Sequence, residues 1–448
     1  MAGFSEIARQ LTHIFAGSFA LLLRWTHWWQ AAVLAIAALL FNVLVLPAFG
    51  RNVFRPGDLD RVMRSGIAIY PLSVLALILC FPHRPDIVAV SWIVLAVGDG
   101  LATMVGAHVR TAALPWNRAK SFGGLVAFVA GASMGGIAIA VWTARGMATP
   151  PPQWFLIGAP VVAALVAGFV ETVPIGLNDN ISVPFTAAFV MWSLTHIEAA
   201  SLSAALPMVS ARLVPALAVN LVFGVLGYRA RTVTLAGAMV GATIGIVTWL
   251  AAGGAGWTML FATFAMAAAA TRLGHQRKAE LGIAEARGGR RGPGNAIANT
   301  GLAAWAFTLS VGLRDATAVQ AAMICAVAAL ATASSDTVAS EVGKAWGKTT
   351  WLITRMRRVA PGTSGAVSLE GTVAGAVGAF ALAAIGAALG LIPTVAVVPV
   401  AIAATLASFA EGWLAVQFEA TGTLNNDSLN FLNSLIGAAL ALLWWSGA

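Results

Sequence analysis

Uninterrupted apolar runs of about twenty residues recur along the whole chain and limit its possible folds more than any other feature. A helical run of this length matches the hydrocarbon thickness of a lipid bilayer. The chain is 59% hydrophobic and only 10% charged, as expected for an integral membrane protein. The runs are continuously apolar rather than alternating, which excludes a β-barrel. We therefore predict an all-α polytopic membrane protein.

The apolar pattern predicts about fourteen transmembrane helices in two halves. In the first half the expected spans lie near residues 27–49, 65–81, 86–107, 121–143, 154–173 and 183–205. In the second half they lie near residues 213–228, 232–251, 255–273, 295–312, 316–335, 366–390, 393–410 and 428–446. Residues 6–24 form a further helix, which either spans the membrane or lies in its interface. Cys80 and Cys325 fall inside apolar segments and are expected to be buried thiols.

Basic residues are concentrated in alternate loops. The loops at 51–64, 108–120, 229–231, 272–294 and 336–365 carry 4, 3, 2, 6 and 5 Lys and Arg, whereas each loop between them carries at most one. The positive-inside rule places the basic loops and the N-terminus in the cytoplasm. This orientation accounts for the net charge of +9, so no nucleic-acid partner is expected. The expected location is a bacterial inner membrane, with the functional sites facing the cytoplasm.

One motif occurs twice, each time where an apolar segment ends in a basic loop. The first copy is Asp99-Gly-Leu-Ala-Thr-Met-Val-Gly106, and the second is Asp336-Thr-Val-Ala-Ser-Glu-Val-Gly343. Each is followed by a basic stretch and then by a glycine-rich segment that we expect to open a helix, Ser121-Phe-Gly-Gly124 or Pro361-Gly-Thr-Ser-Gly365. The repetition predicts two related halves of parallel orientation, at residues 1–210 and 213–448.

The repeat continues with acids and amides. Each half has a lone acid, Glu171 or Glu411, and then an Asn/Asp cluster, 178–180 or 425–427. Acids at the ends of membrane spans are costly unless they face water, a cation or another partner. Carboxylates near Asn side chains are the hard oxygen ligands that suit Mg²⁺. The predicted catalytic acids are Asp99, Glu171, Asp179, Asp336, Glu341 and Asp427, and among them Asp99, Asp179, Asp336 and Asp427 are predicted to hold the metal.

Basic residues and glycine-rich helix starts near these acids suit a phosphorylated ligand. Exposed backbone amides and the helix dipole favour an anion at a helix N-terminus. The residues expected to bind nucleotide or phosphate in the first half are Lys120, Ser121, Gly123, Gly124, Asn178 and Asn180. Those in the second half are Lys344, Arg358, Gly362, Thr363, Ser364, Gly365 and Asn426.

The longest cytoplasmic loop, residues 272–299, allows two interpretations. It is either a flexible basic tether or a phosphate-binding lid over the second site. The contacts of such a lid would be Lys278, Arg290, Arg291, Asn295 and Asn299.

These motifs resemble known families. Residues 1–210 resemble the phytol kinase and dolichol kinase family. The resemblance rests on Glu6-x-x-Arg9-x-x-x-His13, Gly98-Asp-Gly-Leu-Ala-Thr-x-x-Gly106, Lys120-Ser-x-Gly-Gly124, Glu171 and Asn178-Asp-Asn-Ile-Ser-Val-Pro184. Residues 213–448 are similar to the phytyl-phosphate kinase family, long known only as a membrane domain of unknown function. That similarity rests on Ser335-Asp-Thr-Val-Ala-Ser-Glu-Val-Gly-Lys344, Pro361-Gly-Thr-Ser-Gly365, Gly371 and Asn425-Asn-Asp427.

The resemblance implies a bifunctional salvage kinase in the membrane. The first half would phosphorylate a long-chain prenyl alcohol such as phytol, typically from CTP, and the second half would convert the monophosphate to the diphosphate. Mg²⁺ is the expected cofactor, and CTP or another NTP, prenyl alcohol, prenyl phosphate and the lipid bilayer are the expected partners. Met104 stands where the second copy has Glu341, and the spacing from the lone Glu to the Asn/Asp cluster is longer in the second copy. These differences fit different acceptors, an alcohol and a phosphate.

Two alternatives remain at this point. A transporter often has duplicated halves, but its charged residues usually lie at mid-depth rather than at one membrane face. A cytidylyltransferase that acts on a lipid phosphate also pairs Asp with a Lys- and Gly-containing segment. The residue pattern does not identify which carboxylate would take the hydroxyl proton.

Overall fold

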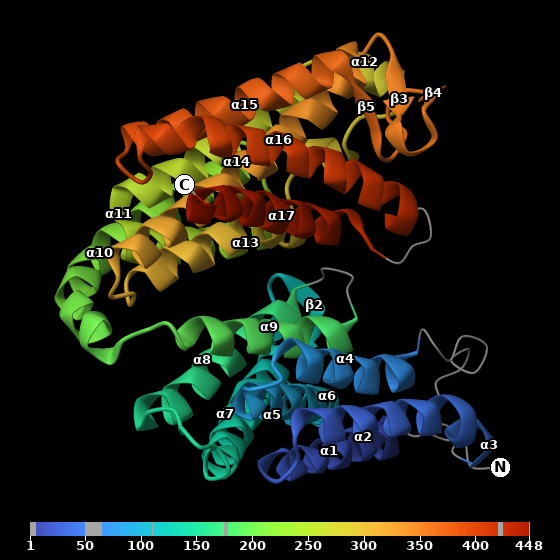
Figure 1. Cartoon of the computed structure of the whole chain (residues 1–448). Helices are drawn as coiled ribbons and strands as arrows, with labels where there is room; N and C mark the ends of the chain where they lie inside the picture. Colours follow the sequence, from blue (N-terminus) through green and yellow to red (C-terminus); the bar gives the residue numbers. More distant parts are fainter. Residues whose placement is uncertain (1–5, 50–64, 110, 174–177, 420–423, 448) are drawn as a thin grey trace. The chain divides into compact units, whose positions relative to one another are not determined.

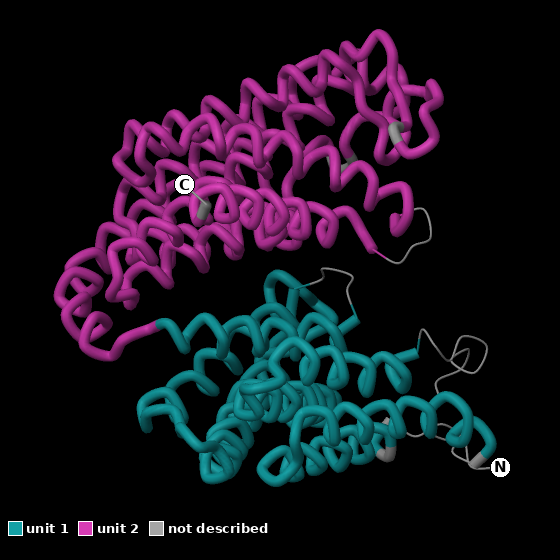
Figure 2. Tube along the Cα trace, viewed as in Figure 1, with its two compact units in different colours: residues 1–196 teal, residues 197–448 magenta. Residues whose placement is uncertain are grey.

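The chain folds into helices with a few short strands. The computed structural model describes residues 6–49, 65–109, 111–173, 178–419 and 424–447. Two compact units are present, residues 1–196 and residues 197–448 (Figure 2). The division after His196 differs from the predicted boundary near residue 210, because one continuous helix, α10 (Ala199–Arg229), carries the chain through that position.

The helices of the first unit pack around α7 (Phe122–Ala144), which contacts α5 (Pro85–Ile93), η5 (Val94–Asp99), α6 (Gly100–His108) and α8 (Gln153–Thr172). Further helices are α1 (Glu6–Gly17), η1 (Ser18–Arg24), α2 (Trp28–Leu40), η2 (Phe41–Val45), α3 (Leu46–Phe49), α4 (Gly66–Cys80) and α9 (Asp179–Leu194). An antiparallel pair of strands, β1 (Ala113–Leu114) and β2 (Asn117–Ser121), precedes α7.

In the second unit, α14 (Ala316–Trp346) occupies the centre (Figure 1). It packs against α11 (Leu235–Arg272), α13 (Pro293–Ser310), α15 (Leu369–Ala388), α16 (Val397–Leu414) and α17 (Asn426–Gly447). Shorter helices are α12 (His275–Glu280), η6 (Ala286–Gly289), η7 (Ile353–Arg355), η8 (Thr394–Ala396) and η9 (Ala415–Glu419). Strands β3 (Thr350–Leu352), β4 (Arg357–Val359) and β5 (Ala366–Ser368) form an antiparallel sheet in the order β4-β3-β5.

The helix α11 is a hairpin of two segments. Gly253 has a non-helical backbone (φ 63°, ψ −157°), and the rings of Trp249 and Trp257 lie 5.8 Å apart. Eight residues of a straight helix would separate these positions by about 12 Å along the axis. Arg291 contacts both ends of α11, because its carbonyl accepts a hydrogen bond from Thr234 and its guanidinium donates one to Thr271. The two spans predicted at 232–251 and 255–273 are therefore present.

Ten helices of the described chain are long and apolar enough to cross a membrane, and Gly66–Cys80 is a shorter apolar helix. This confirms the all-α membrane class but not the predicted count of about fourteen spans. The span predicted at 183–205 is wrong, because α9 ends at Leu194 and α10 begins at Ala199. The basic loop predicted at 51–64 lies outside the described residues.

Candidate functional site

Three carboxylates converge in the first unit. Asp99 ends η5, Glu171 lies in the last turn of α8, and Asp179 opens α9. One oxygen of each lies within 4.8 Å of the other two. Glu171 is buried, whereas Asp99 and Asp179 are partly exposed. Hard oxygen ligands at this spacing fit Mg²⁺, so the fold assembles the group of acids that the sequence predicted.

Lys120 stands beside these acids at the end of β2. Its ammonium pairs with Glu171 and lies 4.0 Å from the carboxylate of Asp179. Burial lowers the pKa of Lys120, but the charge and hydrogen bond of Glu171 more than offset this effect and raise the pKa above its usual range. Lys120 therefore carries a positive charge at neutral pH.

His13 lies on the other side of Asp99, with 3.7 Å between its Nδ1 and a carboxylate oxygen. Burial, followed by the charge of Arg9, lowers the pKa of His13 to about 4. At neutral pH His13 is therefore a neutral neighbour of Asp99 and not an ion-pair partner.

The start of α7 differs from its predicted role. The Ser121 hydroxyl caps the helix by accepting from the amide of Gly124 at 3.2 Å, and the amide of Gly123 donates to Thr111 at 2.9 Å. These amides are thus already used and do not face an anion. A Cβ on Gly124 would lie 3.1 Å from the carbonyl of Ala102, so Gly124 permits close packing of α6 and α7.

Asn178 and Asn180 are also engaged locally. The side-chain oxygen of Asn178 accepts from the amide of Asn180 at 3.0 Å and thereby caps α9. It also accepts from the side-chain nitrogen of Asn180 at 3.0 Å. This cap holds Asp179 at the first residue of the helix, so the two asparagines position an acid, whereas the sequence predicted that they bind nucleotide.

A polar cavity of about 260 Å³ lies in the second unit. Asp336 on α14 and Glu411 on α16 line it, together with Glu419 at the end of η9. Among the described residues of the cavity wall, one, Lys344, is basic. The loop between β4 and β5 closes one side with Gly362, Thr363, Ser364 and Gly365, and Asn426 also lines the cavity.

The two units repeat one local structure. Ser368 caps α15 by accepting from the amide of Gly371 at 3.1 Å, as Ser121 does for Gly124. A Cβ on Gly371 would lie 2.5 Å from the carbonyl of Ala339, the counterpart of Ala102. Each serine is the last residue of a short strand, β2 or β5. The Ser-x-x-Gly segment is therefore the structural repeat.

The predicted alignment of Pro361–Gly365 with Ser121–Gly124 is wrong. The helix α15 begins at Leu369, after β5. Gly362 and Gly365 adopt positive φ angles of 86° and 71°, which permit the loop between β4 and β5. This segment lines the cavity as a loop and does not open a helix.

Glu341 is not part of the described wall of the polar cavity, which corrects its predicted place among the catalytic acids of the second half. It follows Asp336 by five residues, so it points about 140° around α14 from that acid. Its carboxylate pairs with Lys278 and, at 3.3 Å, with Lys344. Glu411, which was not among the predicted catalytic acids, lines the cavity instead. Its position as the counterpart of Glu171 in the repeat was the signal for this role.

Several other predicted residues lie away from the polar cavity. Asp427 and Arg290 are not part of its described wall. The guanidinium of Arg358 lies over the ring of Trp351, 5.4 Å from its centroid, on the exposed strand β4. Arg291 and Asn299 line a different, mostly apolar cavity among α10, α11 and α13. Glu419 was not predicted, although it ends a membrane helix as the predicted acids do.

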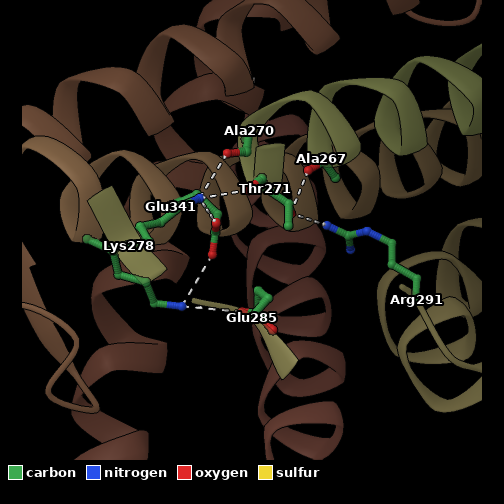
Figure 3. Close-up of polar contacts among 8 residues, drawn as sticks. Ala267, Ala270, Thr271, Lys278, Glu285, Arg291 and Glu341 are labelled. Atoms are coloured by element: carbon green, nitrogen blue, oxygen red, sulfur yellow. Dashed lines mark hydrogen bonds and ion pairs between the residues drawn. The ribbon is translucent and has the colours of Figure 1, made fainter. Parts of the chain in front are cut away.

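The segment predicted to be a tether or a lid forms polar contacts with other parts of the second unit (Figure 3). Lys278 donates to the carbonyl of Thr271 at 2.8 Å, and Glu285 pairs with Lys344 at 3.3 Å. A Cβ on Gly362 would lie 2.8 Å from the side chain of Ile283, so this segment also borders the loop of the polar cavity. The described residues thus argue against a flexible tether.

Comparison with known proteins relates the sequence of this chain to a family of integral membrane proteins. The profile of the family described as integral membrane protein DUF92 matches residues 218–438. The chain is 37% identical over 234 residues to protein VTE6, chloroplastic, of Arabidopsis thaliana, covering 51% of this chain and 70% of that protein. It is 38% identical over 200 residues to an uncharacterized membrane protein of Synechocystis, covering 44% of this chain and 77% of that protein.

A second group of relatives is named for a reaction. The chain is 27% identical over 199 residues to probable phytol kinase 3, chloroplastic, of Glycine max, and spans 62% of that protein's length. No solved structure matches the chain. On the evidence of its matching profile and of two relatives that it covers to 70% and 77% of their length, the chain belongs to the DUF92 family of integral membrane proteins.

Proposed function

We propose that this protein is a bifunctional prenol kinase. The first unit phosphorylates a long-chain prenyl alcohol, and the second phosphorylates the resulting monophosphate, with CTP or another NTP as donor. The observation that carries the proposal is the convergence of Asp99, Glu171 and Asp179 around Lys120 from four separate elements. The relatives named as phytol kinases support a prenyl alcohol as the acceptor.

In the first unit, Asp99, Glu171 and Asp179 are the residues that would hold Mg²⁺. When bound there, Mg²⁺ would neutralise charge on the donor phosphates. Lys120 would contribute a further positive charge beside the transferred group. Phosphoryl transfer depends mainly on such positioning and charge stabilisation. The bond between the γ-phosphorus and its bridging oxygen breaks, the alcohol oxygen bonds to that phosphorus, and a nearby carboxylate takes the hydroxyl proton.

In the second unit the acceptor is already an anion. Lys344 would offset the repulsion between two phosphorylated molecules. The hydroxyls of Thr363 and Ser364 already donate to the carbonyl of Ala360 and to the carboxylate of Glu419. Asp336 and Glu411 are the acids that would hold Mg²⁺ in this cavity. The loops at 272–294 and 336–365 carry eleven Lys and Arg, against seven in the loops at 51–64 and 108–120. Among the described residues of the cavity wall, Lys344 is the one that belongs to these eleven, so the proposal for this unit rests on Lys344 rather than on the loop count.

A product assay tests the proposal. Purified full-length protein would be incubated with Mg²⁺, labelled CTP and geranylgeraniol or phytol. Release of CDP with formation of prenyl monophosphate and diphosphate is the expected result. Pyrophosphate together with a CDP-lipid would instead identify a cytidylyltransferase, and the absence of both product sets would favour a transporter.

The two steps are separated by one substitution. Asp336→Ala is expected to accumulate monophosphate, because it changes the second cavity alone. An unchanged yield of diphosphate would show that one site performs both steps.

A further inference from the structure

An apolar cavity separate from both clusters of acids lies among α10, α11, α13 and α14 and has a volume of about 170 Å³. Its wall is formed mainly by aromatic and aliphatic side chains and by glycines. The aromatic residues that line it are Phe223, Trp257, Phe261 and Phe264. Such a lining suits a hydrocarbon chain and does not suit a nucleotide.

The cavity opens at a surface that carries many large apolar side chains. Phe223 and Phe261 are each 40% exposed, and only 11% of the most apolar window of α10 is buried. Gly241 lines the cavity, and a Cβ placed on it would meet no atom within 4 Å. In a membrane this side faces lipid, so a lipid could enter between the helices.

Most polar groups in the wall are already satisfied within the protein. Asn220 accepts from the indole of Trp257 at 3.1 Å and donates to the carbonyl of Ala216 at 2.8 Å. The hydroxyls of Thr263, Thr300 and Thr337 each donate to a carbonyl one turn earlier in their own helix. These groups leave the middle of the cavity effectively apolar.

Arg291 gives one end of the cavity a different character. Its guanidinium donates to Asn295 at 2.9 Å and to Thr271 at 3.4 Å. No ion pair joins it to a carboxylate among the described residues, but Glu285 and Glu341 lie near enough that their charges raise its pKa, against the larger lowering effect of burial. It also stands at the N-terminus of α13, whose cap residue Gly292 offers no side-chain hydrogen bond. A partly buried cation and a helix N-terminus together favour an anion at this end.

The backbone around Arg291 is held in place. Its amide donates to Thr232 and its carbonyl accepts from Thr234, both at 3.0 Å. A basic side chain at the end of an apolar cavity, on a backbone fixed in this way, matches an amphiphile with an anionic head and a long hydrocarbon tail.

We propose that this cavity binds an isoprenoid monophosphate, with its phosphate at Arg291 and its hydrocarbon chain toward Trp257. That the lipid is an isoprenoid is inferred from the proposed function. That it has an anionic head and an apolar tail is inferred from the residues that line the cavity. Thr337 borders this cavity, whereas its neighbour Asp336 borders the polar one. The site therefore holds the lipid on a different face of α14, about 100° around the helix from Asp336.

A polar network connects the two cavities around α14 (Figure 3). Arg291 contacts the hydroxyl of Thr271, whose carbonyl accepts from Lys278, and Lys278 pairs with Glu341. Glu341 in turn pairs with Lys344 in the wall of the polar cavity. A prenyl monophosphate is the product of the first proposed reaction and the substrate of the second. The apolar cavity would therefore hold the intermediate between the two reactions.

Photolabelling tests the site without any need for turnover. Full-length protein in nanodiscs would be labelled, in the absence of nucleotide, with geranylgeranyl monophosphate that carries a diazirine at the end of its chain. Mass spectrometry should locate the label on residues 216–267. Unlabelled geranylgeranyl monophosphate should compete at least tenfold better than geranylgeraniol. Labels confined to other segments would overturn the proposal.

Two variants sharpen the test. Gly241→Leu should reduce labelling at least tenfold by filling the cavity, whereas Gly158→Leu should not, since a Cβ at Gly158 on α8 also meets no atom within 4 Å. Arg291→Gln should weaken competition by the monophosphate at least tenfold and leave competition by the alcohol unchanged. Wild-type labelling by Gly241→Leu, or unchanged selectivity in Arg291→Gln, would contradict the assignment. The position of the label in the wild-type protein tests the proposal even if a variant fails to fold.

The outcome is distinguishable from that of the proposed function. Asp336→Asn should label as wild type does. If the cavity is labelled but the protein releases no CDP, the proposed kinase activity is wrong and the proposed lipid site is retained. Normal kinase activity without labelling of the cavity would overturn the lipid site alone.

Discussion

Lys278 and Glu341 form an ion pair inside the second unit although 63 residues separate them (Figure 3). Their side chains are 1% and 3% exposed. Lys278 also donates to the carbonyl of Thr271, and Glu341 also pairs with Lys344. A charge in such a place persists only when it is paired, so each residue depends on the other.

Lys278→Met is therefore expected to destabilise the second unit by about 3–5 kcal/mol, because the carboxylate of Glu341 loses a buried partner. Thermal unfolding of the detergent-solubilised protein measures the effect. Arg314→Met is the matched control, since Arg314 is 80% exposed and its pair with Glu198 should contribute at most about 1 kcal/mol. Equal unfolding temperatures for the two variants would show that the buried pair is dispensable.

Glu411→Gln should lower phosphorylation of the monophosphate at least a hundredfold without a comparable loss of stability. The reason is that Glu411 lines the polar cavity with Asp336. The assay supplies prenyl monophosphate and labelled CTP and follows the diphosphate. Glu280→Gln, a change at an exposed acid of α12, should retain full activity. If Glu411→Gln phosphorylated the monophosphate at the wild-type rate, Glu411 would not be a metal ligand in this half.

Phosphorylation of the alcohol should require a divalent cation held by the first group of acids. EDTA should abolish the reaction and Mg²⁺ should restore it. In Asp179→Asn the Mg²⁺ concentration for half-maximal rate should rise at least tenfold, because one of three clustered oxygen ligands becomes a weaker, neutral ligand. An unaltered Mg²⁺ dependence in this variant would exclude Asp179 from the metal site.

The paired glycines should differ in their tolerance of alanine. Gly371→Ala would place a methyl group 2.5 Å from a backbone carbonyl, whereas Gly124→Ala would place one at 3.1 Å. We expect the first substitution to reduce the yield of folded protein severely and the second to shift the unfolding temperature by only a few degrees. Size-exclusion profiles and thermal unfolding compare them. A milder effect at Gly371 would mean that α14 and α15 separate more easily than their contact implies.

The membrane class, the hairpin of α11 and the repeat were all readable from the sequence. Apolar runs near the length of a bilayer-spanning helix predicted the position and order of most helices, although not their number. Asp99, Glu171 and Asp179 could be grouped because each acid ends or begins a membrane helix, where an unpaired charge is costly. The same reasoning selected Asp336 in the second half.

Other assignments depended on which way side chains point. Glu341 and Asp336 lie five residues apart, and only their rotation about α14 sends one to Lys278 and the other to the polar cavity. The amides of Gly123 and Gly124 looked available for phosphate, but Thr111 and Ser121 use them. Arg291 was grouped with the second site, whereas it lines the apolar cavity.

By itself the sequence determined that this is a two-part helical membrane protein and which acids belong at the ends of its helices. The length of an apolar segment and the cost of an unpaired charge at its end are local properties, so they can be predicted from the amino-acid sequence. Only the tertiary structure decided which acid faces which cation, which loop lines the polar cavity, and that a second, apolar cavity ends at Arg291. Those outcomes depend on helix rotation and on contacts between residues far apart in the chain, such as Lys278 with Glu341, and no local pattern encodes them.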